Sequence, residues 1–264
     1  MKHVVPMNKI PEVTLNEAAT APTLVCLPGA MCSPQVFAEA AKRSDLPAIA
    51  LAWLEDDGPH DLLSVAARVS AAISHLPAVI LVGHSVGTPI AILTALHEAR
   101  IGSPRIQGLV LSNSGANTHG HGDIAGLISR IQNQWNQEFW DTFVARCFRT
   151  LPASPLLEQV RAYPSRLRQQ AIVEALLSQQ ATDLAPCLHA LPRVPVAVVH
   201  GRHDPARTLA HAQELAGGIA GATLHVMDTG HTSCAEDPEA FSVVLRVIAL
   251  GQPAGSLLAA PSVR

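Results

Sequence analysis

The sequence is poor in charged and aromatic residues. Of its 264 residues, 15% are charged and 3% are aromatic, and the net charge is −3 with a pI of about 6.5. A nucleic-acid-binding protein carries a basic surface, so this balance argues against nucleic acid as a partner. The 48% of apolar residues can fill a sizeable core, and we expect the partners to be small molecules.

The sequence also lacks an apolar run long enough to cross a membrane, and its N-terminus has no apolar segment typical of a secretion signal. We therefore expect a soluble, cytoplasmic protein with no membrane partner. Cysteines are odd in number and show no CxxC spacing, which argues against a disulfide framework and a thiolate zinc site. They are Cys26, Cys32, Cys147, Cys187 and Cys234, and we expect them to be reduced.

Short apolar runs alternate with segments of helical periodicity. The runs are apolar on both alternating positions, as in strands that are buried on both faces of a parallel sheet. They lie at 23–30, 48–53, 78–84, 108–115, 196–204 and 222–228, and the helical patterns lie at 64–76, 89–101, 208–219 and 238–249. An antiparallel edge hairpin is expected at 7–17. The alternation predicts an α/β fold with a mostly parallel, doubly wound sheet, whose chemistry lies at the carboxyl ends of the strands.

One long segment breaks this alternation. Residues 117–191 show only helical patterns and contain six of the nine aromatic residues of the sequence. We interpret this segment as a helical lid inserted after the sixth strand, above a core formed by residues 1–116 and 192–250. Residues 251–264 are rich in Gly, Pro and Ala, and we expect them to form a flexible C-terminal tail.

The pentapeptide Gly-His-Ser-Val-Gly at 83–87 matches the G-x-S-x-G pattern of a nucleophile elbow. In such an elbow the serine occupies a strained strand-to-helix turn, and both glycines are needed because two backbone segments nearly touch there. An apolar strand precedes the motif, and a helical pattern with Pro89 in its first turn follows it. Ser85 is therefore the expected nucleophile.

A serine hydroxyl needs a base, and the base needs an acid that orients it. Asp204 follows a predicted strand, and His231 lies in a glycine-containing loop before the last helix, so both are expected to be catalytic. Two competitors for the acid are weaker. Asp228 lies too close to His231 in the same loop, and Asn113 cannot ionise.

The developing oxyanion needs two N–H donors. In an elbow of this kind one donor is the residue after the nucleophile, here Val86, and the other lies in the loop after an earlier strand. That loop contains Gly29, which permits a close approach, and Ala30, which is the expected second donor. A site of this composition needs no metal and no organic cofactor.

These motifs resemble the α/β-hydrolase superfamily from about residue 12 to 250. "SNSGA" at 112–116 and the lid length make the chain most similar to small carboxylesterases and 3-oxoadipate enol-lactonase-like hydrolases. Two loops depart from the common pattern, since Pro28 stands where a His is usual and "LEDDGPHD" at 54–61 replaces Asp-x-x-Gly-x-Gly. The resemblance implies an α/β-hydrolase fold that cleaves a carboxylic ester or lactone through an acyl-enzyme.

The lid concentrates aromatic side chains and has no dense cluster of Lys or Arg. We therefore expect a small, largely apolar ester or lactone, bound by some of Trp135, Phe139, Trp140 and Phe143. An anionic substrate would instead need a cation near the serine, for which the lid offers Arg130, Arg146, Arg149, Arg166 and Arg168. The same catalytic residues also suit a thioester or C–C bond hydrolase, a cofactor-free dioxygenase or a non-enzymatic small-molecule receptor.

Overall fold

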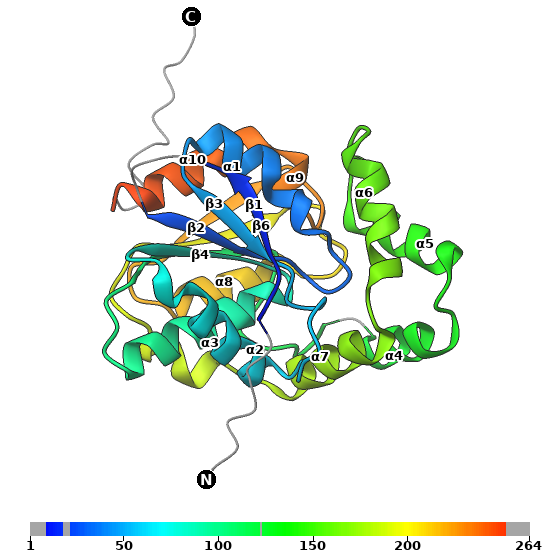
Figure 1. Cartoon of the computed structure of the whole chain (residues 1–264), viewed down its shortest axis with the longest axis horizontal. Coiled ribbons are helices and arrows are strands. Elements are labelled where there is room, and N and C mark those ends of the chain that lie inside the picture. Colours follow the sequence, from blue (N-terminus) through cyan, green and yellow to red (C-terminus); the bar gives the residue numbers. More distant parts are fainter. Residues whose placement is uncertain (1–8, 18–21, 122, 252–264) are drawn as a thin grey trace, which may run out of the picture.

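A seven-stranded sheet forms the centre of the computed structural model, which describes residues 9–17, 22–121 and 123–251 (Figure 1). The strand order is β1-β3-β2-β4-β5-β6-β7, and every pair is parallel except β1 with β3. The predicted α/β class with a mostly parallel, doubly wound sheet is confirmed. The tail expected at 251–264 lies, apart from its first residue, outside the described residues.

The strands are short and bury their side chains on both faces. Their bounds are β1 Glu12–Asn16, β2 Thr23–Leu27, β3 Ala48–Leu51, β4 Val79–His84, β5 Ile106–Ser112, β6 Val196–Gly201 and β7 Thr223–Met227. In β4, Ile80 packs in the core on one side of the sheet and Leu81 in the core on the other. This two-sided burial explains why the strands are apolar at every position instead of alternating.

The N-terminal edge differs from the expected hairpin. Among residues 9–17 the structure has one strand, β1, which pairs antiparallel with β3. Because β1 has no hairpin partner of its own there, the strand that precedes the lid is the fifth of the described chain and not the sixth.

Helices cover both faces of the sheet (Figure 1). On one face lie α1 (Ala38–Ser44), α9 (Ser233–Glu236) and α10 (Pro238–Ala249), and on the other lie α2 (Leu62–Ala72), α3 (Gly87–Arg100) and α8 (Leu209–Gly217). Two short 3-10 helices, η1 (Pro34–Phe37) and η2 (Ile73–His75), precede α1 and follow α2. None of the helices in the described part of the chain combines the length and apolar character needed to cross a membrane.

The segment between β5 and β6 is helical, with no strand among its described residues. It contains α4 (Ile124–Asn133), α5 (Gln137–Cys147), α6 (Leu156–Ala162), η3 (Tyr163–Arg166), α7 (Gln169–Ala181) and η4 (Ala185–Ala190). In Figure 1, α4, α5 and α6 stand beside the sheet and α7 leads back to the core. The Asp123 carboxylate caps α4 and the Asn136 amide oxygen caps α5, so polar residues set where these helices begin.

A buried ion cluster fastens the loop after β3 beneath the lid. The Asp56 carboxylate accepts hydrogen bonds from Arg68 Nε at 3.0 Å and Nη2 at 3.2 Å, and His60 Nε2 lies 3.1 Å from it. Arg168 of the lid donates to the Asp56 carbonyl at 2.6 Å. The loop that departs from the common pattern at 54–61 therefore anchors the C-terminal part of the lid.

Replacement Asp56→Ala should lower the free energy of unfolding by about 3–5 kcal/mol, because it leaves the buried Arg68 guanidinium without its carboxylate. The neighbouring Asp57→Ala is a matched control, since the Asp57 side chain is 84% exposed and its loss should change the free energy by less than about 0.5 kcal/mol. Urea unfolding of both variants measures the difference. Equal stability of the two variants would show that the cluster does not hold this loop.

Candidate active site

The turn between β4 and α3 places Ser85 at the edge of the sheet. Ser85 has a φ of 53°, and its N–H donates to the Ser112 carbonyl at 2.9 Å. A Cβ on Gly87 would lie 1.9 Å from the Leu27 carbonyl oxygen, and one on Gly83 would lie 2.6 Å from the Gly87 carbonyl oxygen. Only glycine fits at either position, because both obstacles are backbone atoms.

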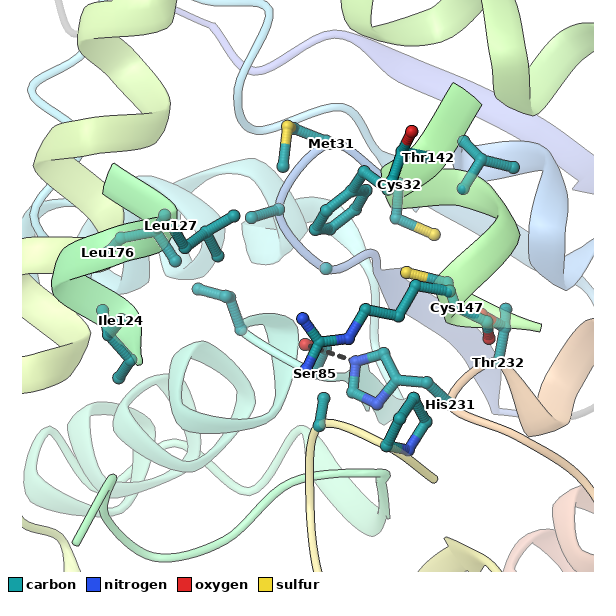
Figure 2. A pocket seen from close by; sticks show the side chains of 18 of the residues that line it. Met31, Cys32, Ser85, Ile124, Leu127, Thr142, Cys147, Leu176, His231 and Thr232 are labelled. Atoms are coloured by element: carbon teal, nitrogen blue, oxygen red, sulfur yellow. Dashed lines mark hydrogen bonds between the residues drawn. The ribbon is translucent and has the colours of Figure 1, made fainter. Parts of the chain in front are cut away.

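Three side chains from separate loops form one hydrogen-bonded chain. His231 Nε2 lies 3.0 Å from Ser85 Oγ, as Figure 2 shows, and His231 Nδ1 lies 2.8 Å from Asp204 Oδ2. The Asp204 side chain is fully buried and that of His231 is nearly so. The structure therefore brings the predicted nucleophile, base and acid together in the order that their chemistry requires.

Asp204 is held as an anion by several donors. Its Oδ1 accepts from the N–H groups of Ala206 at 2.7 Å and Arg207 at 3.0 Å, and its Oδ2 also accepts from Asn113 Nδ2 at 3.1 Å. Burial alone would raise the pKa of this carboxyl. His231 and the hydrogen-bond donors outweigh that effect and hold the pKa well below its usual range. Asn113, which cannot ionise, instead donates a hydrogen bond to the Asp204 carboxylate.

The competing acid lies at the surface. Asp228 is 72% exposed, and its carboxylate is 2.6 Å from Arg149 Nη1 and 2.7 Å from His203 Nε2. These two partners, and not His231, bind this carboxylate.

His84 supports the backbone of His231. Its Nε2 donates to the His231 carbonyl oxygen at 2.9 Å. Burial, together with the nearby His231, lowers the pKa of His84 to about 3, so the ring is neutral at physiological pH. The residue before Ser85 therefore supports the His231 backbone without adding charge.

The two predicted oxyanion donors lie beside Ser85. Ala30 and Val86 both line the cavity, and neither N–H donates a hydrogen bond to another described residue. A Cβ on Gly29 would lie 2.9 Å from the Ser85 Cβ, and Trp53 Nε1 holds the preceding carbonyl of Pro28 at 2.9 Å. The loop after β2 is thus fixed close to the hydroxyl.

A carboxylate ties the lid to the loop that carries His231. Glu236 accepts from the N–H of Gly230 at 2.9 Å, and from the N–H groups of Arg149 and Thr150 at 2.9 and 3.1 Å. The end of α5 and the histidine loop are therefore joined through one side chain.

A cavity of about 500 Å³ opens above the serine between the core loops and the lid. Figure 2 shows Leu127 and Leu176 on one side of Ser85 and Cys32 and Cys147 on the other. Both cysteines are free, and burial raises the pKa of their thiols, so they offer no thiolate at neutral pH.

The four predicted aromatic residues divide into two pairs. Phe139 and Phe143 line the cavity. Trp135 and Trp140 are not among its described lining residues, and their expected position in the site is corrected. They meet edge to face with ring centroids 5.3 Å apart, and the Trp135 ring also lies 6.2 Å from the Phe139 ring. Trp135 thus supports Phe139, one of the two phenylalanines that line the cavity.

The lid arginines divide in the same way. Arg130 and Arg146 line the cavity. The other three lid candidates bind elsewhere: Arg149 pairs with Asp228, Arg166 with Glu55 at 2.6 Å, and Arg168 with the Asp56 carbonyl. One more arginine lines the cavity, and it lies outside the lid, where the sequence does not predict a cation. This residue is Arg207, and its only sequence signal is its place three positions after the buried acid.

The sheet topology and the serine at a strand-to-helix elbow are features of α/β hydrolases. The model of the "Alpha/beta hydrolase family" matches residues 24–243, and the chain belongs to this family. No curated protein gives a significant sequence match.

Several solved structures share the fold. An enol-lactonase from Burkholderia xenovorans is 19% identical with a TM-score of 0.75, over 91% of this chain and 96% of that one. A hydrolase from Pseudomonas aeruginosa is 22% identical with a TM-score of 0.76, over 91% and 93% of the two chains. An esterase from Exiguobacterium antarcticum is 18% identical with a TM-score of 0.76, over 90% and 94%. At these sequence identities, the similarity shows a shared fold.

Replacement Gly87→Ala should lower the free energy of unfolding by about 3 kcal/mol or more, since the new methyl group meets a backbone oxygen that cannot move aside. Gly217→Ala at the end of α8 is the matched control. Its new methyl group has no neighbour within 4 Å, so the change should be neutral or stabilising by up to about 1 kcal/mol. Thermal and urea unfolding measure both, and a Gly87→Ala protein as stable as the control would contradict the close crossing.

Proposed function

We propose that this chain is a serine hydrolase that cleaves a small carboxylic ester or lactone through an acyl-enzyme. The observation that carries the proposal is the continuous hydrogen-bonded chain from Asp204 through His231 to Ser85, which ends at a cavity. This geometry supports nucleophilic catalysis because the base contacts the hydroxyl and the acid fixes the orientation of the base.

In the proposed mechanism, His231 Nε2 removes the Ser85 proton while Oγ attacks the carbonyl carbon. The N–H groups of Ala30 and Val86 stabilise the resulting oxyanion, and each such donor contributes about 3 kcal/mol to lowering the barrier. His231 then returns the proton to the leaving alkoxide oxygen as the C–O bond breaks. Water, deprotonated by His231, releases the acid and restores the serine. The buried Asp204 stabilises the imidazolium that forms in both steps.

The cavity supports a substrate of modest size with a mostly apolar body. Phe139, Phe143 and Leu127 are among the lining residues, and burial of each methylene stabilises the complex by about 0.8 kcal/mol until the space is filled. The names of two structural neighbours, an enol-lactonase and an esterase, agree with ester or lactone chemistry. A cavity of about 500 Å³ has the size of a small-molecule binding site.

Replacement Ser85→Ala should abolish the hydrolysis of p-nitrophenyl esters, with kcat reduced by about 10⁴-fold or more, and leave the unfolding transition unchanged. A panel from acetate to octanoate, followed at 400 nm on the wild-type protein and the variant, makes the measurement. Turnover by Ser85→Ala above a few per cent of the wild-type value would refute the nucleophile. Absence of turnover in the wild-type protein over the whole panel would refute ester hydrolysis.

Replacement Asp204→Asn should reduce kcat by about three to four orders of magnitude in a folded protein, because the imidazole loses the carboxylate that orients it. Asp228→Asn is the matched control. It changes the same functional group at an exposed position bound to Arg149 and His203, and it should retain activity. The reverse pattern, with Asp228→Asn inactive and Asp204→Asn active, would show that the other aspartate is the acid.

A further inference from the structure

Gln179 is a buried polar residue in the wall of the cavity that contains Ser85. It lies in the last turn of α7, and only 5% of its surface is exposed. Leu176 lies one turn earlier on the same face of the helix and also lines the cavity. Figure 2 shows Leu176 on the same side of Ser85 as Leu127. Gln179 therefore places a carboxamide in an apolar part of the wall.

The side-chain amide of Gln179 has no hydrogen-bond partner among the described residues. Gln169, at the start of the same helix, does have one, because its Nε2 donates to the Ile131 carbonyl at 2.6 Å. Some unpaired polar atoms of the described chain are sealed from solvent, such as Nδ1 of His84, but neither amide atom of Gln179 is among them. Oε1 and Nε2 of Gln179 are therefore both unpaired and open to the cavity.

Two hydroxyl groups of the same cavity wall are bound within the protein. The Thr232 hydroxyl donates to the Cys147 carbonyl at 3.1 Å, and the Thr142 hydroxyl donates to the Glu138 carbonyl at 2.8 Å. Gln179 differs from both, because no described residue of the protein compensates the burial of its amide.

A buried carboxamide without a partner is costly, because the removal of its donor and acceptor from water is not offset. A ligand that offsets this cost must donate to Oε1 and accept from Nε2. A primary carboxamide does both through two parallel hydrogen bonds, whichever way the amide of Gln179 is turned. A carboxylate has no donor for Oε1, and a hydroxyl has only one oxygen to serve both atoms.

We propose that Gln179 binds a carboxamide group of the substrate through Oε1 and Nε2, so that the preferred substrate is an ester or lactone that also carries a neutral primary carboxamide. This inference rests on the proposed function for its ester or lactone part. Gln179 is then a specificity-determining residue. The apolar lining holds the body of the substrate, and the glutamine selects its polar end.

Two pairs of esters with matched shapes test the proposal. The first is p-nitrophenyl adipamate with p-nitrophenyl 6-methylheptanoate, which end in a carbamoyl or an isopropyl group, and the second is one methylene longer, pimelamate with 7-methyloctanoate. The wild-type protein should favour the carbamoyl ester of at least one pair, and Gln179→Leu should lower this ratio of kcat/KM values by about tenfold or more. Gln180→Leu is the matched control, because it removes the same amide at the exposed neighbouring position. It should keep the wild-type ratio.

Gln179→Met covers the case in which the branched leucine does not fit, as judged by circular dichroism, because methionine is unbranched and adapts to its surroundings. It should lower the ratio in the same way. A wild-type preference for the isopropyl ester in both pairs, or a ratio that survives in the folded variant, would overturn the proposal. An equal fall of kcat/KM for mono-p-nitrophenyl adipate would do the same, since that ester carries a carboxylate.

Thermal unfolding provides a second readout. At least one of Gln179→Leu and Gln179→Met should have a Tm no lower than that of the wild-type protein, because neither change breaks a hydrogen bond within the described protein. A clear fall of Tm in both variants would show that the amide has a structural role and would overturn the proposal.

Binding to the Ser85→Ala protein separates this inference from the proposed function. The methyl esters of both pairs are titrated calorimetrically into Ser85→Ala and into Ser85→Ala/Gln179→Leu, where no hydrolysis is required. Relative to its isopropyl partner, the carbamoyl ligand of at least one pair should bind about tenfold or more weakly to the second protein than to the first. If the wild-type protein hydrolyses none of the esters, the proposed function fails, and these titrations still support or overturn carboxamide binding by Gln179.

Discussion

Two backbone segments cross beneath Ser85 at a distance that leaves no room for a side chain. The turn from β4 into α3 meets the end of β2 so closely that a Cβ on Gly87 would overlap the Leu27 carbonyl oxygen. This crossing sets the left-handed backbone of Ser85 and brings the loop at Gly29 beside its hydroxyl. A non-glycine residue in such a conformation costs about 1–3 kcal/mol, which the buried strands on either side sustain. The position of Ser85 relative to the loop at Gly29 is therefore set by the sheet.

The loop after β6 carries two buried groups of opposite charge, the Asp204 carboxylate and the Arg207 guanidinium. His231 and hydrogen-bond donors keep the pKa of the Asp204 carboxyl low, and the Arg207 guanidinium stays protonated at neutral pH although burial lowers its pKa. Backbone N–H groups of the same loop bind the second oxygen of Asp204, so the carboxylate does not need the guanidinium as a direct partner. Asp204 and Arg207 therefore both keep their charges within one short loop.

The sequence predicted the parts of the site that strand ends determine. Ser85, Asp204 and His231 each follow an apolar run, and parallel strands bring such positions to one edge of the sheet. The lid was harder, because a helical pattern does not say which face meets a cavity. Phe139 and Phe143 are four residues apart and share a face of α5, whereas Trp140 is turned about 100° from Phe139. Arg207 could not be predicted, because burial of a single arginine in a loop leaves no periodic pattern in the sequence.

The lid leaves the core after β5 and returns at β6, and these strands are neighbours, with Leu109 paired to Val196. Any two adjacent parallel strands need a long crossover, and here the crossover itself carries the insertion. Its two ends therefore meet the sheet side by side, and the register of the strands does not depend on what lies between them. The lid could therefore be replaced as one unit without a change in the sheet. A different lid would alter the apolar wall of the cavity, whereas Arg207, which belongs to the core, would stay in place.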